Sequence, residues 1–250
     1  MKYVQLGRTG TRVSTLCFGT MSFGSYATPE TAHALYGACR EAGINFFDCA
    51  NSYAGGGRAE SLLGACMKAD RDDIVITSKV CRPMSKDTNG SGLSRRHIMA
   101  EVEASLRRLD TDRIDVYFAH HYDPFTRVEE TLRAFEDLRR QGKILYAGVS
   151  NWSAWRIADA LGVSAAQGLV AFDVVQPMYN LVKRQAEYEL FPLAEAKGLA
   201  VMIFSPLASG LLTRANADPD GARRGRLAEP RYLKRYEDRR NFEIAAEFCR

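Results

Sequence analysis

The chain has 250 residues, 46% of them hydrophobic and 26% charged, which is typical of a soluble globular protein with a substantial core. The net charge of +4 is mild, and no basic run with interleaved aromatic residues indicates a nucleic-acid surface. No segment reaches the roughly 18 apolar residues of a membrane span, and the N-terminus lacks a signal-peptide core. The six cysteines show neither C-x-x-C nor zinc spacing. We therefore expect a cytoplasmic protein without a metal site and without nucleic-acid or membrane partners.

The first predicted elements are a small hairpin, one strand and one helix. KYVQL and TRVS flank a Gly-containing turn, which predicts a β-hairpin over residues 2–14. A first strand is expected at 15–19. Thr28, Pro29 and Glu30 then combine a capping hydroxyl, a proline and an early acid, which together predict a helix start.

From residue 45 onward, short apolar runs alternate with stretches long enough for one helix each. The predicted strands are 45–50, 74–80, 115–120, 145–150, 172–176 and 199–205. The predicted helices lie near 59–68, from Ser94, from Val128 to Gly142, and near 154–161, 185–197 and 239–250. Strands joined by such short crossovers are parallel and buried on both sides.

This alternation predicts an α/β protein, a (β/α)8 TIM barrel with an N-terminal β-hairpin. A doubly wound sheet is the alternative, but GTMSFG follows the first strand in place of G-x-G-x-x-G. Residues 207–250 contain a Pro-, Gly- and Arg-rich loop and no eighth apolar run. We therefore expect one barrel domain over 1–250 that stops before the eighth strand, with an incomplete C-terminus.

Polar residues stand at the carboxyl ends of the predicted strands. Barrel enzymes have their catalytic residues at this end of the barrel. Asp48 and Tyr53, then Lys79, then His120 close three consecutive predicted strands. A Lys ammonium lowers the pKa of a nearby tyrosine, a carboxylate orients the Lys, and a His can bond a substrate oxygen. Such a set protonates a carbonyl oxygen while hydride attacks the carbon, which implies a nicotinamide cofactor. Taken singly, each residue is more often a surface or packing residue.

The segment GINFFDCANSYAGGGRAESLLG resembles the aldo-keto reductase signature, in which D-x-A-x-x-Y supplies the catalytic Asp and Tyr, here Asp48 and Tyr53. The family's Lys matches Lys79 in ITSKV, and its His matches His120 in DVYFAH. The resemblance covers residues 1 to about 212 in order. It implies an NADP(H)-dependent oxidoreductase that reduces aldehydes or ketones to alcohols, with Tyr53 as proton donor.

The same resemblance implies cofactor contacts. A Ser–Asn pair and a Gln hold the nicotinamide amide in the family, an aromatic residue stacks on its ring, and an S-P-L-x-x-G turn meets the pyrophosphate. The matching residues, together with one assigned after the first strand, are Ser150, Asn151, Gln176, Phe204, Ser205, Leu207, Gly210 and Met21. NADPH/NADP+ is the implied cofactor, although no residue matches the family's 2′-phosphate site, so the preference over NADH is open.

Other readings stay open at this point. The chain could be a cofactor-binding regulatory or scaffold protein, since some members of the resembling family are channel-associated subunits, or an inactive truncated reductase fragment. His121 competes with His120, but strand alternation points neighbours to opposite faces, and the D-x-Y-x-x-H spacing favours His120. The natural carbonyl substrate and the assembly into a homo-oligomer are not determined by the sequence.

Overall fold

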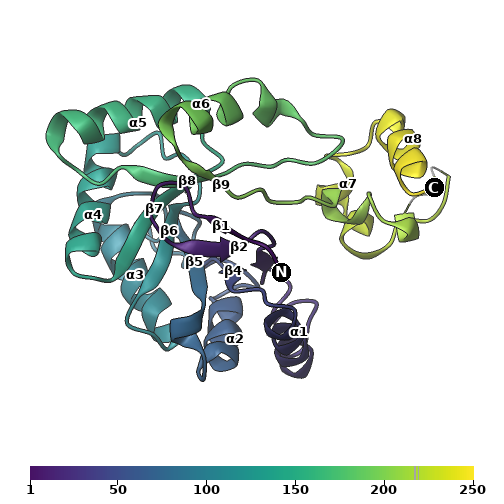
Figure 1. The fold of residues 1–250 in the computed structure, drawn as a ribbon, viewed down its shortest axis with the longest axis horizontal. Coiled ribbons are helices and arrows are strands. Elements are labelled where there is room, and N and C mark those ends of the chain that lie inside the picture. The colour runs from purple at the N-terminus through teal and green to yellow at the C-terminus, as the bar shows by residue number, and fades with distance from the viewer. Residues whose placement is uncertain (217, 219) are drawn as a thin grey trace. The chain divides into compact units, whose positions relative to one another are not determined.

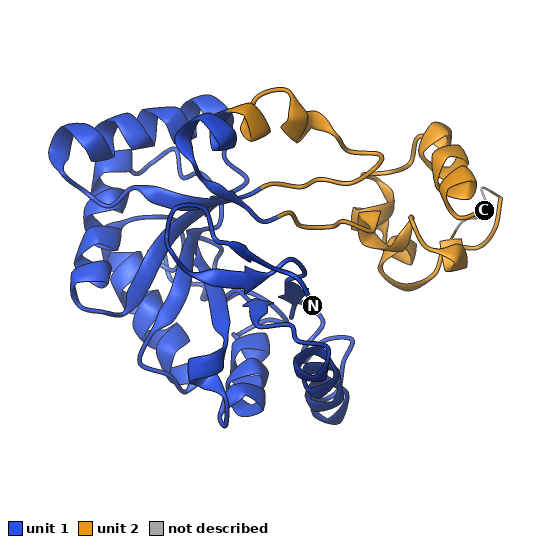
Figure 2. Cartoon of the chain, in the orientation of Figure 1, with its two compact units in different colours: residues 1–176, 193–202 blue, residues 177–192, 203–250 orange. Residues whose placement is uncertain are grey.

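The structure is a computed structural model that describes residues 1–216, 218 and 220–250. These residues divide into two compact units (Figure 2). Unit 1 comprises 1–176 and 193–202, and unit 2 comprises 177–192 and 203–250.

A parallel sheet forms the centre of unit 1. Within the described residues it has seven strands in the order β3 to β9, and all neighbouring pairs are parallel. The strands are β3 (Phe18–Gly19), β4 (Phe46–Asp48), β5 (Val75–Val80), β6 (Ile114–Ala119), β7 (Ile144–Ser150), β8 (Phe172–Gln176) and β9 (Ala200–Val201). An antiparallel hairpin of β1 (Tyr3–Gln5) and β2 (Arg12–Ser14) precedes the sheet. The curled sheet with helices on its outer side confirms the predicted barrel class with an N-terminal hairpin (Figure 1).

Helices connect the strands, and those of unit 1 begin at or within one residue of the predicted starts. The helix predicted near 185–197 begins only at Leu190, because Gln185–Glu187 form a 3-10 turn. Those of unit 1 are α1 (Pro29–Glu41), α2 (Arg58–Met67), α3 (Arg95–Leu109), α4 (Val128–Arg140) and α5 (Ala154–Gln167), with a 3-10 turn η1 (Arg71–Asp73). The Thr28 side chain accepts a hydrogen bond from the Thr31 N–H, and that of Ser94 accepts one from the His97 N–H. Both caps satisfy backbone donors that have no partner inside the helix. Helix α6 (Leu190–Lys197) begins in unit 2 and ends in unit 1.

Unit 2 is built from short helical elements around its own apolar cluster. They are η2 (Gln185–Glu187), η3 (Ala208–Gly210), η4 (Arg214–Asn216), η5 (Gly225–Ala228), α7 (Pro230–Leu233) and α8 (Arg239–Phe248). The buried members of the cluster are Ala208, Leu211, Leu212, Leu227, Tyr236, Phe242 and Ala245. The Asp238 side chain caps α8 by accepting from the Arg240 N–H.

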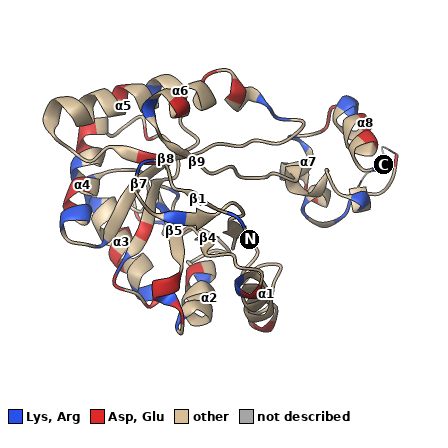
Figure 3. Ribbon diagram, in the orientation of Figure 1, with Lys and Arg blue, Asp and Glu red and all other residues tan. Residues whose placement is uncertain are grey.

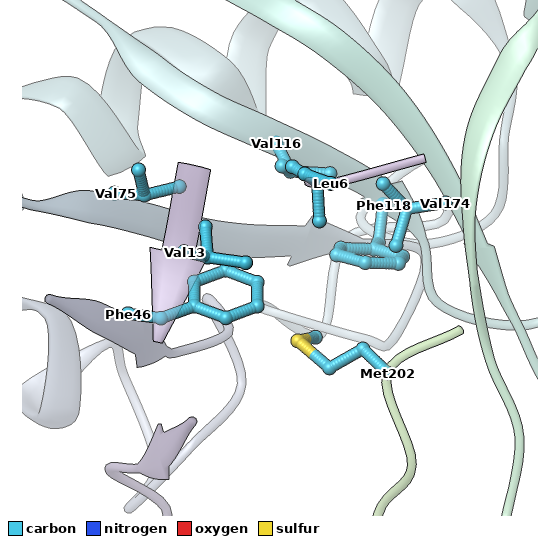
Figure 4. Packing of buried hydrophobic residues seen from close by; sticks show 8 residues of the cluster. All are labelled: Leu6, Val13, Phe46, Val75, Val116, Phe118, Val174 and Met202. Carbon is cyan, nitrogen blue, oxygen red and sulfur yellow. The ribbon is translucent and has the colours of Figure 1, made fainter. Parts of the chain in front are cut away.

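Apolar side chains from the N-terminal hairpin and from the strands fill the interior of the curled sheet. Leu6 and Val13, which flank the hairpin turn, pack into a buried cluster whose other members come from the strands and the residue after β9 (Figure 4). Those members are Phe46, Val75, Val116, Phe118, Val174 and Met202. Because side chains along a strand alternate between faces, residues two positions further toward the carboxyl end of each strand face the same interior.

The outer surface of unit 1 carries charges of both signs. Lys and Arg are interspersed with Asp and Glu on α3, α4 and α5 (Figure 3). This mixture is the ordinary composition of a solvated surface. In the described part of the chain, no helix combines the length and apolarity needed to cross a membrane.

Helix α2 packs closely on the end of α3, and this contact predicts a sharp difference between two helical glycines. A Cβ at Gly64 would lie 2.6 Å from the Leu109 carbonyl oxygen, whereas a Cβ at Gly162 of α5 meets nothing within 4 Å. We expect Gly64→Ala to destabilise the fold by about 1–3 kcal/mol through overpacking. Gly162→Ala should stabilise it by about 0.5–1 kcal/mol. Urea unfolding of both variants tests this, and equal midpoints would contradict the described helix contact.

Candidate active site

Buried polar side chains lie at the carboxyl ends of five neighbouring strands. Asp48, Lys79, His120, Ser150 and Gln176 are each at most 9% exposed. They lie on or just beyond β4 to β8, on the same alternating face as the apolar cluster below them. The strand order therefore brings together side chains that are far apart in the sequence.

An ion pair joins the first two of these strands. The Lys79 Nζ lies 2.6 Å from the Asp48 Oδ1 and donates to the Cys49 carbonyl oxygen at 2.7 Å. The same Asp48 oxygen accepts hydrogen bonds from the Thr77 hydroxyl at 2.7 Å and the Gln176 amide at 2.9 Å. A buried charge is tolerated when it is paired and hydrogen-bonded in this way.

Lys79 keeps its positive charge although its side chain is completely buried. Burial by itself lowers the pKa of the Lys79 ammonium, but the attraction of Asp48 and the contact with Tyr53 raise it above its usual value. The Lys79 Nζ donates to the Tyr53 hydroxyl at 3.2 Å and lies 4.9 Å from the centre of the Tyr53 ring. Lys79 thus stays a cation and contacts both a carboxylate and a phenol.

Tyr53 departs from the sequence-based expectation in one respect. Burial raises its pKa to about 12, and this effect exceeds the lowering by the Lys79 ammonium. The expectation of a pKa below the ordinary tyrosine value was therefore wrong in net direction, although Lys79 does act in the expected sense. At neutral pH the Tyr53 hydroxyl is a neutral proton donor beside a cation that stabilises its phenolate.

His120 is a neutral imidazole next to this group. Burial, followed by repulsion from Lys79, lowers the pKa of His120 to about 2. Its ring meets that of Tyr53 edge to face at 6.0 Å, and its Nδ1 is buried without a partner among the described residues. A neutral imidazole can donate one hydrogen bond and accept another.

His121 does not point away from His120 as strand alternation predicts. The two rings stack with centroids 5.0 Å apart, and Arg82 donates to the His121 Nε2. The reason is that β6 ends at Ala119, so the alternating geometry no longer applies to the residues after it.

Of the other predicted cofactor residues of unit 1, Ser150, Asn151 and Gln176 are hydrogen-bonded to one another or to this group. The Ser150 hydroxyl donates to the Gln176 carbonyl oxygen at 2.9 Å. The Asn151 amide donates to the His120 carbonyl oxygen at 3.0 Å and to the Ser150 hydroxyl at 2.9 Å. Asn151 has a φ of 60°, which turns the chain just after β7. Met21 lies in the turn after β3, where its carbonyl oxygen accepts from the Ser25 hydroxyl.

The remaining four predicted residues belong to unit 2. The Phe204 N–H donates to the Pro177 carbonyl oxygen at 3.0 Å. Ser205 (φ 56°) and Gly210 (φ 101°) have left-handed backbone conformations in the turns next to and within η3. The side chain of Leu207 is 52% exposed.

A second polar network, on the outer side of the sheet, was not predicted. The Ser78 hydroxyl donates to Glu60 at 2.5 Å, and Glu60 accepts from Arg108 at 2.6 Å. Ser78 points outward because its neighbour Lys79 points inward. This parity, with an acid in the preceding helix α2, was the signal available in the sequence.

The same network reaches the segment that carries Tyr53. Asn51 is fully buried between Asp48 and Tyr53, and its amide donates to Glu101 of α3 at 3.0 Å. Glu101 in turn lies 3.6 Å from Arg108. The segment from Asp48 to Tyr53 is therefore tied to α3 as well as to β5.

Comparisons with known proteins show the family of the chain. The model of the aldo/keto reductase family matches residues 15–247. The chain is 44% identical over 218 residues to a "Probable voltage-gated potassium channel subunit beta" of Oryza sativa subsp. japonica, covering 85% of this chain and 66% of that protein. It is 38% identical over 248 residues to the "Uncharacterized oxidoreductase YrpG" of Bacillus subtilis (strain 168), covering 94% and 76%.

A relative of Arabidopsis thaliana, also called "Probable voltage-gated potassium channel subunit beta", is 41% identical over 218 residues, covering 85% of this chain and 66% of that protein. The chain thus spans just under two thirds of the length of these two plant relatives. The family match extends over most of the chain, and the residues of the buried polar group of unit 1 lie within the matched range. The chain belongs to the aldo/keto reductase family.

Proposed function

We propose that the chain carries an NADP(H)-dependent oxidoreductase activity that reduces aldehydes or ketones to alcohols, with Tyr53 as the proton donor. One observation carries the proposal: a fully buried ammonium, Lys79, contacts both the Asp48 carboxylate and the Tyr53 hydroxyl. A cation in this position stabilises the phenolate that remains when the phenol gives its proton to a carbonyl oxygen, as carbonyl reduction requires. The corresponding partner is a small carbonyl compound, and a single barrel domain in the cytoplasm is the setting we propose.

Each residue of the polar group has its own role in the proposed reduction. Tyr53 gives its proton to the carbonyl oxygen as negative charge develops there. Lys79 stabilises the phenolate that remains, and Asp48 holds Lys79 in place. His120 is neutral, so its ring N–H can donate to the same oxygen without competing for the proton.

The side chains at the ends of β7 and β8 fit a nicotinamide carboxamide. Ser150, Asn151 and Gln176 offer a hydroxyl and two amides, and a carboxamide has both donors and acceptors to match them. When bound, the nicotinamide supplies the hydride. We assign Met21 to the same cofactor, together with Phe204, Ser205, Leu207 and Gly210 from unit 2.

A second candidate function is a cofactor-binding subunit of another protein. It is favoured by the names of the two plant relatives, which are described as probable channel subunits. The two candidates are not exclusive, since a subunit can retain reductase chemistry.

Calorimetric titration with NADPH, followed by an assay of NADPH oxidation with 4-nitrobenzaldehyde, tests the proposal. Binding with turnover supports the reductase. Binding without turnover supports the second candidate, and absence of binding contradicts both.

Replacement of Tyr53 tests the proton donor. We expect Tyr53→Phe to lower the turnover number by about 10²–10⁴-fold, the usual worth of general acid catalysis, and to change NADPH affinity only a few-fold. Tyr146→Phe is the control, because it also removes a hydrogen-bonded hydroxyl, one that contacts Thr9 and Thr11. Retention of more than about a tenth of the rate by Tyr53→Phe would assign the proton to another group.

Replacement of Lys79 tests the buried ion pair. Lys79→Met leaves the Asp48 carboxylate buried without a cation and should cost about 3–5 kcal/mol of stability. The double variant Asp48→Asn/Lys79→Met removes both charges and should recover part of that loss. Urea unfolding gives both values, and a double variant no more stable than Lys79→Met would show that the lost ion pair is not the cause.

The neutral state of His120 predicts how stability depends on pH. Its pKa is lowered in the fold, whereas the unfolded chain takes up a proton near pH 6.5. Its contribution is thus complete above pH 6.5 and is lost as the pH falls, by about 1.4 kcal/mol per pH unit. His120→Asn should reduce the loss of stability between about pH 7 and 5, measured by urea unfolding. His33→Asn, at an exposed position, is the control, and equal slopes for wild type and His120→Asn would refute a neutral His120.

A further inference from the structure

A cleft of about 380 Å³ lies in unit 1 outside the group described above. Its walls come from the loop between β6 and α4 and from the segment that leads from β7 into α5. Its lining includes the aromatic residues Tyr122, Phe125, Trp152 and Trp155, the basic residues Arg127 and Arg156, and the acidic residue Asp159. None of them takes part in the polar group around Lys79.

Aromatic rings dominate the walls, and two of them face solvent. The side chain of Phe125 is 96% exposed and that of Trp155 is 63% exposed. Large exposed apolar rings around a hollow mark binding sites more often than ordinary surface. An exposed ring can stack on a planar ligand.

Two hydrogen-bond donors of the lining residues have no acceptor among the described residues. Trp152 is only 4% exposed, and its Nε1 is buried without a hydrogen-bond partner in the described part of the chain. The Arg156 Nε is likewise buried without a hydrogen-bond partner among the described residues. Leaving such donors unpaired is unfavourable, so an acceptor that reaches them gains binding energy.

Charge in the cleft favours an anion. Arg156 lies over the Tyr122 ring at 3.7 Å and near the Trp155 ring at 5.0 Å, and forms no ion pair with any described carboxylate. Arg127 adds a second cation, against the single carboxylate of Asp159. A guanidinium that stacks on rings still presents its N–H groups at its edge, where a carboxylate binds in a fork.

We propose that this cleft binds a small planar aromatic carboxylate, with its ring against Phe125 and Trp155 and its carboxylate toward Arg156 and the Trp152 N–H. The aromatic walls select the ring, and the unpaired donors select the anion. The carboxylate binds at the edge of the Arg156 guanidinium, which stays stacked on the Tyr122 ring. This site is separate from the proposed reductase chemistry and does not depend on it.

The chain offers a direct probe, because it contains two tryptophans and both line the cleft. Tryptophan emission should therefore change saturably when sodium benzoate is titrated at constant ionic strength. Benzamide, which has the same ring without the charge, should bind at least tenfold more weakly. Acetate and inorganic phosphate should give no saturable change. Equal responses to benzoate and benzamide, or to benzoate and phosphate, would overturn the proposal.

Substitutions of Arg156 test whether benzoate binds in this cleft. Arg156→Leu should weaken benzoate binding at least tenfold, and Arg156→Lys should retain part of it. Arg107→Leu, at an exposed position on α3, should have no effect. Unchanged affinity in Arg156→Leu would overturn the proposal, with circular dichroism as the check on folding.

The titration is repeated with saturating NADPH to separate this cleft from the proposed reductase site. Benzoate binding should persist with unchanged affinity. Loss of binding in the presence of NADPH would place benzoate in the reductase site and overturn the proposal. Failure of NADPH to bind would count against the proposed function and leave the cleft titration valid.

Discussion

The buried ion pair between Lys79 and Asp48 is the constraint on which the rest of the site depends. A fully buried ammonium is stable only with a paired and hydrogen-bonded anion, and Asp48 meets this need while also accepting from Thr77 and Gln176. These donors come from β5 and β8, so the pair holds the carboxyl ends of non-adjacent strands in one arrangement. The apolar cluster below it keeps water out from the hairpin side.

Burial has opposite effects on the pKa values of the two groups beside this pair, and both effects keep the groups neutral. The pKa of Tyr53 rises and that of His120 falls, because burial disfavours the phenolate and the imidazolium alike. The charges of the site are therefore concentrated on Lys79 and Asp48, and the groups nearest a substrate oxygen are neutral donors. This distribution suits the carbonyl reduction that we propose and agrees with membership of the aldo/keto reductase family.

The outer face of the sheet supports the inner one. Alternation along β5 sends Lys79 inward and Ser78 outward, where Glu60 and Arg108 hold it. Asn51 links the segment before Tyr53 to Glu101 on α3. The position of the phenol is thus fixed from two sides, by strand pairing within the sheet and by hydrogen bonds to the surrounding helices.

The sequence by itself determined the alternation of strands and helices, the hairpin, the cap at Thr28, the helix start at Ser94, and the polar residues at the strand ends, because these depend on local periodicity and spacing. Only the tertiary structure decided the net pKa of Tyr53, the stacking of His121 on His120 and the bond from Asn51 to Glu101, which joins residues 50 positions apart. The aromatic cleft around Trp152 and Arg156 likewise came from the fold alone. Burial and contacts between distant residues set these features, and neither can be read from neighbours along the chain.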